Sequence, residues 1–536
     1  MTSLLRYCLS LLLDFWERSR LGRVMSVILP ALIQVVNPPY SRKRRRSCSD
    51  DVAPERRPQQ KKSMDDLAAE VQARFEAPAQ TERMLEMSLR LQEEYREKLG
   101  KSEISMLPSF QHTLPNGGEK GEYLALDVGG STFRAALIRL AGRKGEREGL
   151  QVRRMRSFVI NEDIRRLKGR EFFDWMASKI GEMLAEYNHI KGTTDARLKM
   201  GMAWSFPVEQ TSPRTGKLLT MGKGFTAGHG VEGEDLADLV MDACRARNLN
   251  VELCAIVNDG AATLLSQAYR DPATRMSLIL GTGMNAAVFL PTTALGPSKF
   301  GPRSDSWFAA ASRVVVNTEI SMFGKHVFPT TKWDDQLNSS HRLPDYQPLE
   351  YLITGRYLGE ILRLILLEAI PTTNLFSGYI PEKLDEPYTL ETRLLAHFEQ
   401  DTTPDLSVAS AAFATAHPLP SPPTLPELKF IRSATQVAST RAAAYLGTAL
   451  HALWAVRTAA EGLSPGEASH VTIACDGSMV EKYPGFRQRT QGFLDELCVQ
   501  SGAEAGTVRL EVVKEGSIFG AGVAVGCMGE EEGEGS

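Results

Sequence analysis

Two widely separated segments share one unusual pattern, and this repetition limits the folds open to the chain more than any other feature. In "YLALDVGGSTFRAALI", Tyr123 to Ile138, a carboxylate, two glycines and two hydroxyl side chains interrupt an apolar run, which then resumes. "MSLILGTGMNAAVFL", Met276 to Leu290, repeats the pattern with Gly-Thr-Gly at its centre. Each segment predicts a strand, a tight glycine turn and a second strand. Two copies in one chain indicate a duplicated α/β domain.

Glycine turns of this kind expose backbone N–H groups and carry no Cβ atom that would keep a ligand away. A phosphate group is therefore the ligand expected at both turns, with a nucleotide between the two copies. The first segment taken alone is equally compatible with an ordinary hairpin. The repetition favours the phosphate interpretation.

A third segment lies between the two hairpins. In "IVNDGAATLL", Ile256 to Leu265, an apolar strand ends in Asn258 and Asp259, and a helix-like run follows. A carboxylate at a strand end, at the junction of two domains, is well placed for catalysis. The alternative is that Asp259 caps the next helix, and the pattern taken alone favours the cap.

Composition excludes several classes of protein. A length of 536 residues allows two or more domains with a large core. A net charge of −3 with 43% hydrophobic residues argues against nucleic-acid binding and against wholesale disorder. The seven cysteines are scattered without zinc-ligand spacing, which indicates a reducing compartment and no disulfide framework.

The N-terminal segment, residues 1–49, differs from the rest of the chain. It carries nine basic side chains and two acidic ones, and its two apolar stretches are shorter than the ~20 residues of a membrane span. A basic cluster, "RKRRR", occupies Arg42 to Arg46. Three interpretations stay open: a targeting segment or weak membrane anchor, a nuclear signal, or an unstructured extension that arises from an early start codon, with Met25 as the alternative start. A cleaved secretory signal is not expected, because no convincing small-residue cleavage site follows the first apolar stretch.

Polar and Pro-containing residues then predict a linker, so that residues 1–62 form an extension and linker. Apolar residues at helical spacing predict two helices between Ser63 and Gly100, separated at Pro78. The acidic end of the chain, residues 527–536, is expected to be disordered.

Eight segments in order resemble the motifs of the eukaryotic, fungal-type hexokinases, over roughly Ser63 to Val525. They are "LALDVGGSTFR", "WSFPVEQTSPRTGKLLTMGKGF", "VNDGAATL", "GTGMNAA", "VNTEISMFG", "PDYQPLEYLITGRYLGEILRL", "STRAAAYLG" and "CDGSMVEKYPGF". The resemblance implies an α/β, two-lobed actin-like ATPase (hexokinase) fold with a central cleft. Residues 123–258 would form the small lobe and residues 259–505 the large lobe. N-terminal helices within residues 63–122 would pack on the large lobe, and residues 506–526 would return to the small lobe.

The same resemblance implies an ATP-dependent hexose kinase, which transfers the γ-phosphate of ATP to the 6-hydroxyl of glucose or a similar hexose, the first step of glycolysis. Asp259 would accept the proton of that hydroxyl, and Lys223 would stabilise the transferring phosphoryl group. Asp127 would hold Mg²⁺ through water. Arg134 is expected to support the first loop rather than to touch phosphate, and Arg441 to form an ion pair on a helix surface.

The remaining site residues are also carried over from the family. The hexose would be bound by Ser205, Lys223, Asn258, Asp259, Asn285, Glu319 and Glu350. The nucleotide would be bound by Asp127, Gly129, Gly130, Ser131, Thr132, Gly281, Thr282, Gly283, Gly477 and Ser478.

Several positions depart from the family pattern. Met221 and Gly222 stand where the family has Trp and Thr, so one sugar hydrogen bond is lost, and Gly222→Thr is expected to restore it unless Gly222 has a positive φ. The segment Gly260 to Thr263 lacks the hydroxyl beside the base, Ser131 and Thr132 replace Thr-Asn, and Ile518 replaces a small residue.

The departures leave two main interpretations: a working hexose kinase with weakened sugar affinity, or a weak or inactive hexokinase-like regulator that senses sugar or nucleotide. A kinase for another sugar is less favoured, because the sugar carboxylates and asparagines are present. The protein is expected in the cytosol, with attachment to the mitochondrial outer membrane through residues 1–46. Its expected partners are a hexose and ATP, without nucleic acid; the sequence leaves the oligomeric state open.

Overall fold

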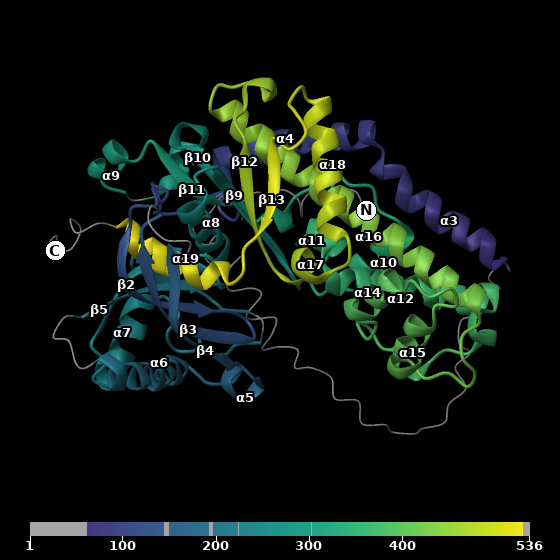
Figure 1. The fold of residues 1–536 in the computed structure, drawn as a ribbon, viewed down its shortest axis with the longest axis horizontal. Coiled ribbons are helices and arrows are strands. Elements are labelled where there is room, and N and C mark those ends of the chain that lie inside the picture. Colours follow the sequence, from purple (N-terminus) through teal and green to yellow (C-terminus); the bar gives the residue numbers. More distant parts are fainter. Residues whose placement is uncertain (1–61, 144–148, 192–196, 223, 302, 529–536) are drawn as a thin grey trace, which may run out of the picture. The chain divides into compact units, whose positions relative to one another are not determined.

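A five-stranded sheet contains the first glycine turn. In the computed structural model, the described residues are 62–143, 149–191, 197–222, 224–301 and 303–528. The sheet has the order β4-β3-β2-β5-β8 (Figure 1). Its strands are β2 (Lys120–Val128), β3 (Thr132–Ala141), β4 (Leu150–Val159), β5 (Leu198–Trp204) and β8 (Val251–Val257). The pairs β2–β3 and β3–β4 are antiparallel, whereas β2–β5 and β5–β8 are parallel.

A six-stranded sheet contains the second glycine turn and has the order β1-β11-β10-β9-β12-β13. Its strands are β1 (Leu107–Pro108), β9 (Thr274–Leu280), β10 (Met284–Pro291), β11 (Arg313–Asn317), β12 (Val471–Asp476) and β13 (Val508–Val512). The pairs β11–β10 and β10–β9 are antiparallel, whereas β9–β12 and β12–β13 are parallel. The first sheet has the same order of pair types, from β4 to β8. The strand–glycine turn–strand prediction is therefore confirmed for both segments, and the duplication extends to the strands around them.

Two helices, α8 (Asp259–Arg270) and α19 (Gly516–Cys527), contact each other and connect the two sheets. α19 packs on β2 and β5 of the five-stranded sheet, and α8 packs on β9 and β10 of the six-stranded one. Their contact is close because glycines lie within it: a Cβ on Gly520 would lie 1.7 Å from the carbonyl oxygen of Ala262. A Cβ on Gly201 of β5 would likewise lie 1.9 Å from the carbonyl oxygen of Ala521. Ile518 is fully buried in this contact, so the departure at this position adds apolar packing.

The opposite face of the five-stranded sheet is covered by α6 (Arg170–Lys191) and α7 (Leu236–Ala246), with the short α5 (Glu162–Arg165) nearby. A core of aromatic and aliphatic side chains fills this layer, among them Phe172, Trp204 and Leu239. A two-stranded ribbon of β6 (Val208–Gln210) and β7 (Gly216–Leu218) follows β5.

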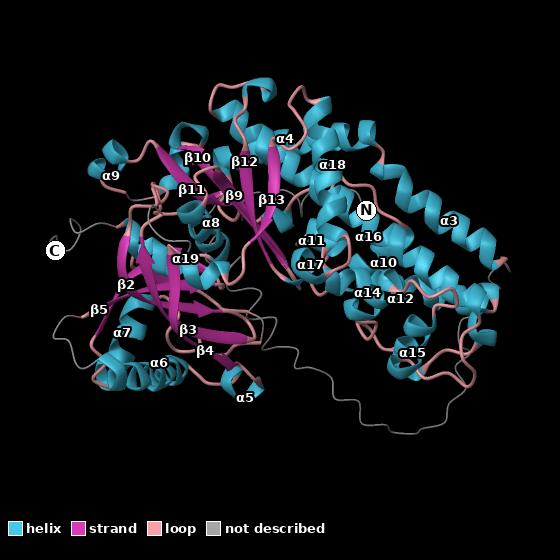
Figure 2. Cartoon of the chain, in the orientation of Figure 1, coloured by secondary structure: helices cyan, strands magenta, loops and turns pink. Residues whose placement is uncertain are grey.

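The six-stranded sheet is accompanied by a helical region built around the 36-residue α16 (Leu425–Ala460), as Figure 2 shows. α16 contacts α3 (Met64–Glu76), α4 (Thr81–Lys101) and α18 (Phe486–Gln500). The break between α3 and α4 falls at Ala77–Ala79, which confirms the separation at Pro78. The other helices are α9 (Asp305–Ala310), α10 (Lys332–Ser340), α11 (Pro348–Ile353), α12 (Gly355–Thr373), α13 (Glu382–Asp385), α14 (Thr392–Gln400), α15 (Ser407–Ala416) and α17 (Ser478–Lys482). None of the described helices is both long and apolar enough to cross a membrane.

Arg441 corrects one prediction. It forms an ion pair, but inside the helical region rather than on a helix surface: its side chain is 0% exposed and that of its partner Asp334 is 2% exposed. Nη1 and Nη2 donate to the two carboxylate oxygens over 2.6 and 2.7 Å, and the guanidinium lies 4.2 Å from the ring centroid of Phe75. The pair is buried because α3 covers the side of α16 that the local sequence pattern left open.

Candidate active site

The N-terminus of α8 brings together three of the predicted site residues. Asn258 is the N-cap, and its Oδ1 accepts from the N–H of Ala261. Asp259 is the first residue of the helix; its Oδ1 accepts from Asn258 Nδ2 (2.9 Å) and from the N–H of Gly260 (2.8 Å). Its Oδ2 accepts from the hydroxyl of Ser205, which follows β5, over 3.2 Å. Asn258, rather than Asp259, thus caps the helix. The carboxylate of Asp259 accepts hydrogen bonds from Asn258, Gly260 and Ser205.

A second group of predicted residues lies on the six-stranded sheet. Asn285 on β10 donates from Nδ2 to Oδ1 of Asn317 on β11 over 2.8 Å. Asn317 Nδ2 donates in turn to Oε1 of Glu319 over 2.9 Å. Glu319 has a left-handed backbone (φ +50°), which is uncommon for a residue with a side chain and is typical of functional sites. Asn317 was missed by the sequence analysis, although it lies in the quoted "VNTEISMFG" segment.

The two groups are neighbours. A Cβ built on Gly260, next to Asp259, would lie 3.2 Å from Asn258 Oδ1 and 3.6 Å from the Cβ of Ala287 on β10. The hydroxyl of Ser277 on β9 also donates to the carbonyl oxygen of Gly260 over 2.7 Å. The start of α8 therefore lies against β10 beside Asn285.

Glu350 lies at the second glycine turn. Its Oε2 accepts from the N–H of Met284, the residue after the turn, over 3.0 Å. A Cβ on Gly283 would lie 3.0 Å from the same oxygen, so glycine leaves room for the carboxylate. Thr354, just after α11, donates from its hydroxyl to the carbonyl oxygen of Thr282 over 3.3 Å. A single helix, α11, thus links the predicted sugar ligand to the predicted phosphate turn.

The other predicted nucleotide residues of this half lie on the same turn or beside it. Gly281 donates its N–H to the carbonyl oxygen of Gly283 over 2.9 Å, which closes the turn. A Cβ on Gly281 would be 3.7 Å from the hydroxyl oxygen of Ser478. Gly477 has φ +120°, and a Cβ there would lie 2.3 Å from the carbonyl oxygen of Leu280. Only glycine fits this approach of the β12–α17 connection to the end of β9.

The first glycine turn, Gly129 to Thr132, is closed by a 3.0 Å hydrogen bond from the N–H of Gly129 to the carbonyl oxygen of Thr132. The carbonyl oxygen of Gly130 accepts from Arg165, and that of Ser131 from the N–H of Ile160. No described residue accepts a hydrogen bond from the N–H of Gly130 or Ser131. Two backbone donors on one turn suit an anion such as phosphate.

Asp127 lies on β2 directly before this turn and opposite Arg134 on β3. Arg134 donates to Asp127 Oδ2 from Nε, over 2.8 Å, and from Nη2. Burial raises the pKa of Asp127 above its usual range, the guanidinium of Arg134 opposes the shift, and the charge of Asp259 adds to it. The prediction that Arg134 supports the first loop is consistent with these bonds.

The described residues contain no group of three or more His, Cys, Asp or Glu side chains that could hold a metal. Asp127 is the carboxylate predicted to hold a cation here, and such a cation would need further ligands. Mg²⁺ keeps several waters and binds through one or two carboxylates together with substrate phosphates, so a lone carboxylate fits that ion.

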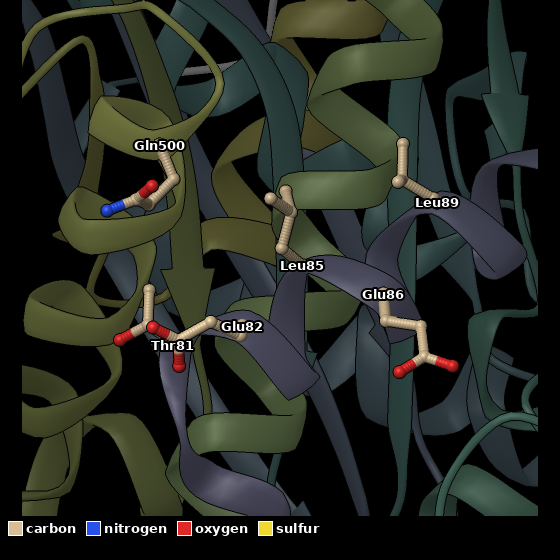
Figure 3. A pocket seen from close by; sticks show the side chains of 6 residues that line it. All are labelled: Thr81, Glu82, Leu85, Glu86, Leu89 and Gln500. Atoms are coloured by element: carbon tan, nitrogen blue, oxygen red, sulfur yellow. The ribbon is translucent and has the colours of Figure 1, made fainter.

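Lys223, predicted as catalytic, lies outside the described residues, and its neighbours Gly222 and Gly224 have φ of +66° and +81°. A separate surface groove of about 280 Å³ lies between α4 and the end of α18 (Figure 3). Its lining contains none of the predicted site residues and consists of Thr81, Glu82, Leu85, Glu86, Leu89 and Gln500.

The duplicated sheets and the residues at their junction define a two-lobed, actin-like ATPase fold. Two family models, both described as hexokinase, match residues 68–269 and 275–527. The chain is 32% identical over 426 residues to Hexokinase-1 of Oryza sativa subsp. japonica, covering 79% of this chain and 82% of that protein. It is 30% identical over 426 residues to Hexokinase-1 of Saccharomyces cerevisiae, covering 79% and 83%.

A solved structure of hexokinase from Schistosoma mansoni complexed with glucose has a TM-score of 0.71 and 28% identity, covering 87% of this chain and 100% of that chain. The chain belongs to the hexokinase family.

Proposed function

We propose that the protein transfers the γ-phosphoryl group of ATP to the 6-hydroxyl of glucose or a similar hexose. The observation that carries the proposal is the carboxylate of Asp259, fixed by Asn258, Gly260 and Ser205 next to the polar side chains of β10 and β11. Family membership supports the enzyme over the regulatory alternative. The glucose complex of the Schistosoma mansoni relative supports a hexose as the sugar.

Asp259 would act as the general base. Phosphoryl transfer depends mainly on positioning and on charge stabilisation, and a fixed carboxylate can take the proton of the attacking hydroxyl. One of its oxygens holds two hydrogen bonds, whereas Oδ2 holds the hydroxyl of Ser205. A sugar hydroxyl that replaced or joined Ser205 at Oδ2 would be in position to give up its proton.

The hexose would be bound by hydrogen bonds of fixed direction. Glu319 and Glu350 accept from sugar hydroxyls, whereas the asparagine amides of Asn258 and Asn285 can both donate and accept. Asn317 holds Asn285 and Glu319 in one row and so fixes their spacing. Lys223 would stabilise the transferring phosphoryl group from the loop between Gly222 and Gly224.

ATP would lie along the two glycine turns, with phosphate oxygens on the N–H groups of Gly130 and Ser131. Gly281 to Gly283, Gly477 and Ser478 would form the other side of the nucleotide site. Asp127 would hold Mg²⁺ through water, and the bound ion would neutralise phosphate charge.

The lobe boundaries follow the same proposal, with one correction: residues 123–258 form the small lobe and residues 259–505 the large one. Within residues 506–526, β13 (Val508–Val512) pairs with β12 and so belongs to the large lobe, and only α19 returns to the small lobe. The packing of α19 on β2 and β5 supports this division.

A coupled assay of ATP-dependent glucose phosphorylation tests the proposed activity. Turnover that requires both glucose and Mg²⁺ is the expected result. Glucose or nucleotide binding without turnover would instead favour the regulatory alternative.

We also propose that residues 1–46, outside the described part of the chain, direct the protein to the mitochondrial outer membrane. Their apolar and Arg-rich composition suits an anionic membrane surface. A fluorescent fusion without them should become diffuse in the cytosol, and identical distributions of the full-length and truncated fusions would refute the proposal.

A further inference from the structure

Arg134 uses all three of its guanidinium nitrogens within the protein. Nε and Nη2 donate to Asp127 Oδ2, Nη1 donates to Glu515 Oε2, and Nη2 also reaches the hydroxyl of Ser517 over 3.2 Å. The carboxylate side chain of Asp127 is 5% exposed. Four of the five guanidinium N–H groups are engaged in this way, so the main role of Arg134 lies in the residues that it holds in place.

The partners of Arg134 come from two distant parts of the chain. Asp127 precedes the first glycine turn, whereas Glu515 and Ser517 flank the start of α19. Glu515 has a left-handed backbone (φ +57°), a conformation that costs free energy for a residue other than glycine and persists only where surrounding contacts hold it. Its ion pair with Arg134 is such a contact.

The start of α19 is also attached to the six-stranded sheet. The N–H of Gly516 donates to Oδ2 of Asp476, the last residue of β12, over 3.1 Å. A Cβ on Gly516 would lie 3.0 Å from the side chain of Thr263 on α8. Residues 515–517 are thus held by Arg134 from one sheet and by Asp476 from the other.

We propose that Arg134 is the positioning residue of the metal–nucleotide site: it fixes the Asp127 carboxylate and ties it, through Glu515, to the junction of the two sheets. This inference rests on the proposed function. Asp127 is the carboxylate assigned to Mg²⁺, and it lies beside the backbone donors of the first glycine turn. Within the described part of the chain, no hydrogen bond of Arg134 involves a residue assigned to the hexose. The effect of Arg134 is therefore specific to the nucleotide and its metal.

The test compares Arg134→Lys with the wild-type protein. Lysine keeps the charge but cannot reproduce the fork that holds Asp127 and Glu515 together. Binding of a fluorescent ATP analogue is titrated with and without Mg²⁺, and glucose binding is measured by calorimetry. Since hydrogen bonds between charged groups are the stronger kind, the Kd of the Mg²⁺-bound analogue should rise at least about tenfold. The Kd of glucose should stay within about twofold.

Arg170→Lys is the matched control. Arg170, at the start of α6, also pairs with two carboxylates of the same half: Glu234, just before α7, over 2.8 Å, and Asp242 on α7 over 3.1 Å. It should leave both affinities unchanged. Glu515→Gln provides a second variant in case Arg134→Lys fails to fold. Arg134 then keeps its bonds to Asp127 and Ser517 but loses the ion pair with Glu515, and the Kd of the Mg²⁺-bound analogue should rise about threefold or more.

A folded Arg134→Lys protein with unchanged affinity for the Mg²⁺-bound analogue would overturn the inference, as would an equal loss of glucose affinity. If Arg134→Lys does not fold, an unchanged nucleotide affinity of Glu515→Gln would overturn it instead. A wild-type protein that binds the Mg²⁺-bound analogue but does not phosphorylate hexose would refute the kinase proposal, while the binding comparison would still decide the role of Arg134. A wild-type protein that binds no nucleotide would refute both.

Discussion

The hydroxyl of Ser205 donates a hydrogen bond to Oδ2 of Asp259 over 3.2 Å, and this contact joins the end of β5 to the start of α8. Ser205, which the sequence analysis assigned to the hexose, and Asp259, which it assigned to both the hexose and catalysis, therefore share one site. In the proposed reaction the same oxygen faces the attacking hydroxyl.

Asp259→Ala should reduce hexose phosphorylation by roughly 10²- to 10⁴-fold, the usual contribution of a general base. Glucose binding should weaken but stay detectable, because the residues on β10 and β11 are unchanged. Steady-state kinetics and calorimetry measure the two effects. A variant that keeps more than a few per cent of wild-type kcat would remove Asp259 from the role of base.

Asn317→Ala should weaken glucose binding about tenfold, although no sugar contact was assigned to Asn317. The physical reason is that its amide holds both Asn285 and Glu319, over 2.8 and 2.9 Å. Glu319→Gln, which alters one assigned ligand, should weaken glucose binding by a similar factor and leave nucleotide binding little changed. Asn116→Ala serves as the control, because among the described residues its side chain makes a single, local hydrogen bond, accepted by Oδ1 from the N–H of Gly118. Calorimetry that gives equal glucose affinity for Asn317→Ala and wild type would refute this role.

The sequence predicted the parts of the fold that local pattern determines. Both glycine hairpins and the start of α8 at Asn258 and Asp259 follow from apolar runs, turn residues and capping chemistry. The link through Asn317 depends on the register between β10 and β11. The burial of Arg441 depends on the contact between α16 and α3. Contacts of this kind join residues far apart in the chain, so no local pattern contains them.

Arg441→Met should destabilise the protein by about 3–5 kcal/mol, because it leaves Asp334 buried without its partner. Arg441→Met combined with Asp334→Leu should recover only part of that loss, since both charges are removed but the two hydrogen bonds that Thr331 donates to Asp334 are lost as well. The exposed pair of Arg170 offers the comparison, and Arg170→Met should cost no more than about 1 kcal/mol. Denaturant unfolding curves measure all of these variants, and a loss under 1 kcal/mol for Arg441→Met would contradict the buried pair.

His451 should make the protein less stable in mild acid. Its ring lies between the hydroxyls of Ser88 and Ser501, and burial lowers its pKa from 6.5 to about 4. The unfolded chain therefore binds a proton more readily than the folded one, so stability is lost as the pH falls from about 6.5 to about 4. Between pH 7 and pH 5 the loss should be about 2 kcal/mol.

His451→Gln removes the titrating group, and unfolding in urea at both pH values measures the difference. The variant should lose less stability than the wild type over this interval, by about 2 kcal/mol. An identical pH dependence in both proteins would show that His451 is not buried in its neutral form.

Gly222→Thr should destabilise the protein rather than increase its affinity for glucose. The sequence comparison suggested that threonine would return a sugar hydrogen bond, on the condition that the backbone could accept it. Gly222 has φ +66°, and residues with a side chain pay roughly 1–2 kcal/mol in that region. Nothing lies within 4 Å of a Cβ built there, so the cost comes from the backbone alone.

Adding Met221→Trp to Gly222→Thr should destabilise the protein further. Met221 is 2% exposed within the core that contains Phe206 and Phe225, and a larger side chain there would cost about a further 1–3 kcal/mol. Gly222→Asn is the matched control, because asparagine tolerates the left-handed region better than threonine does. Thermal unfolding, glucose affinity and turnover should be measured for all of these variants. A stable Gly222→Thr protein that binds glucose three- to tenfold more tightly would contradict the left-handed backbone at Gly222 and would identify this loop as the source of weakened sugar affinity.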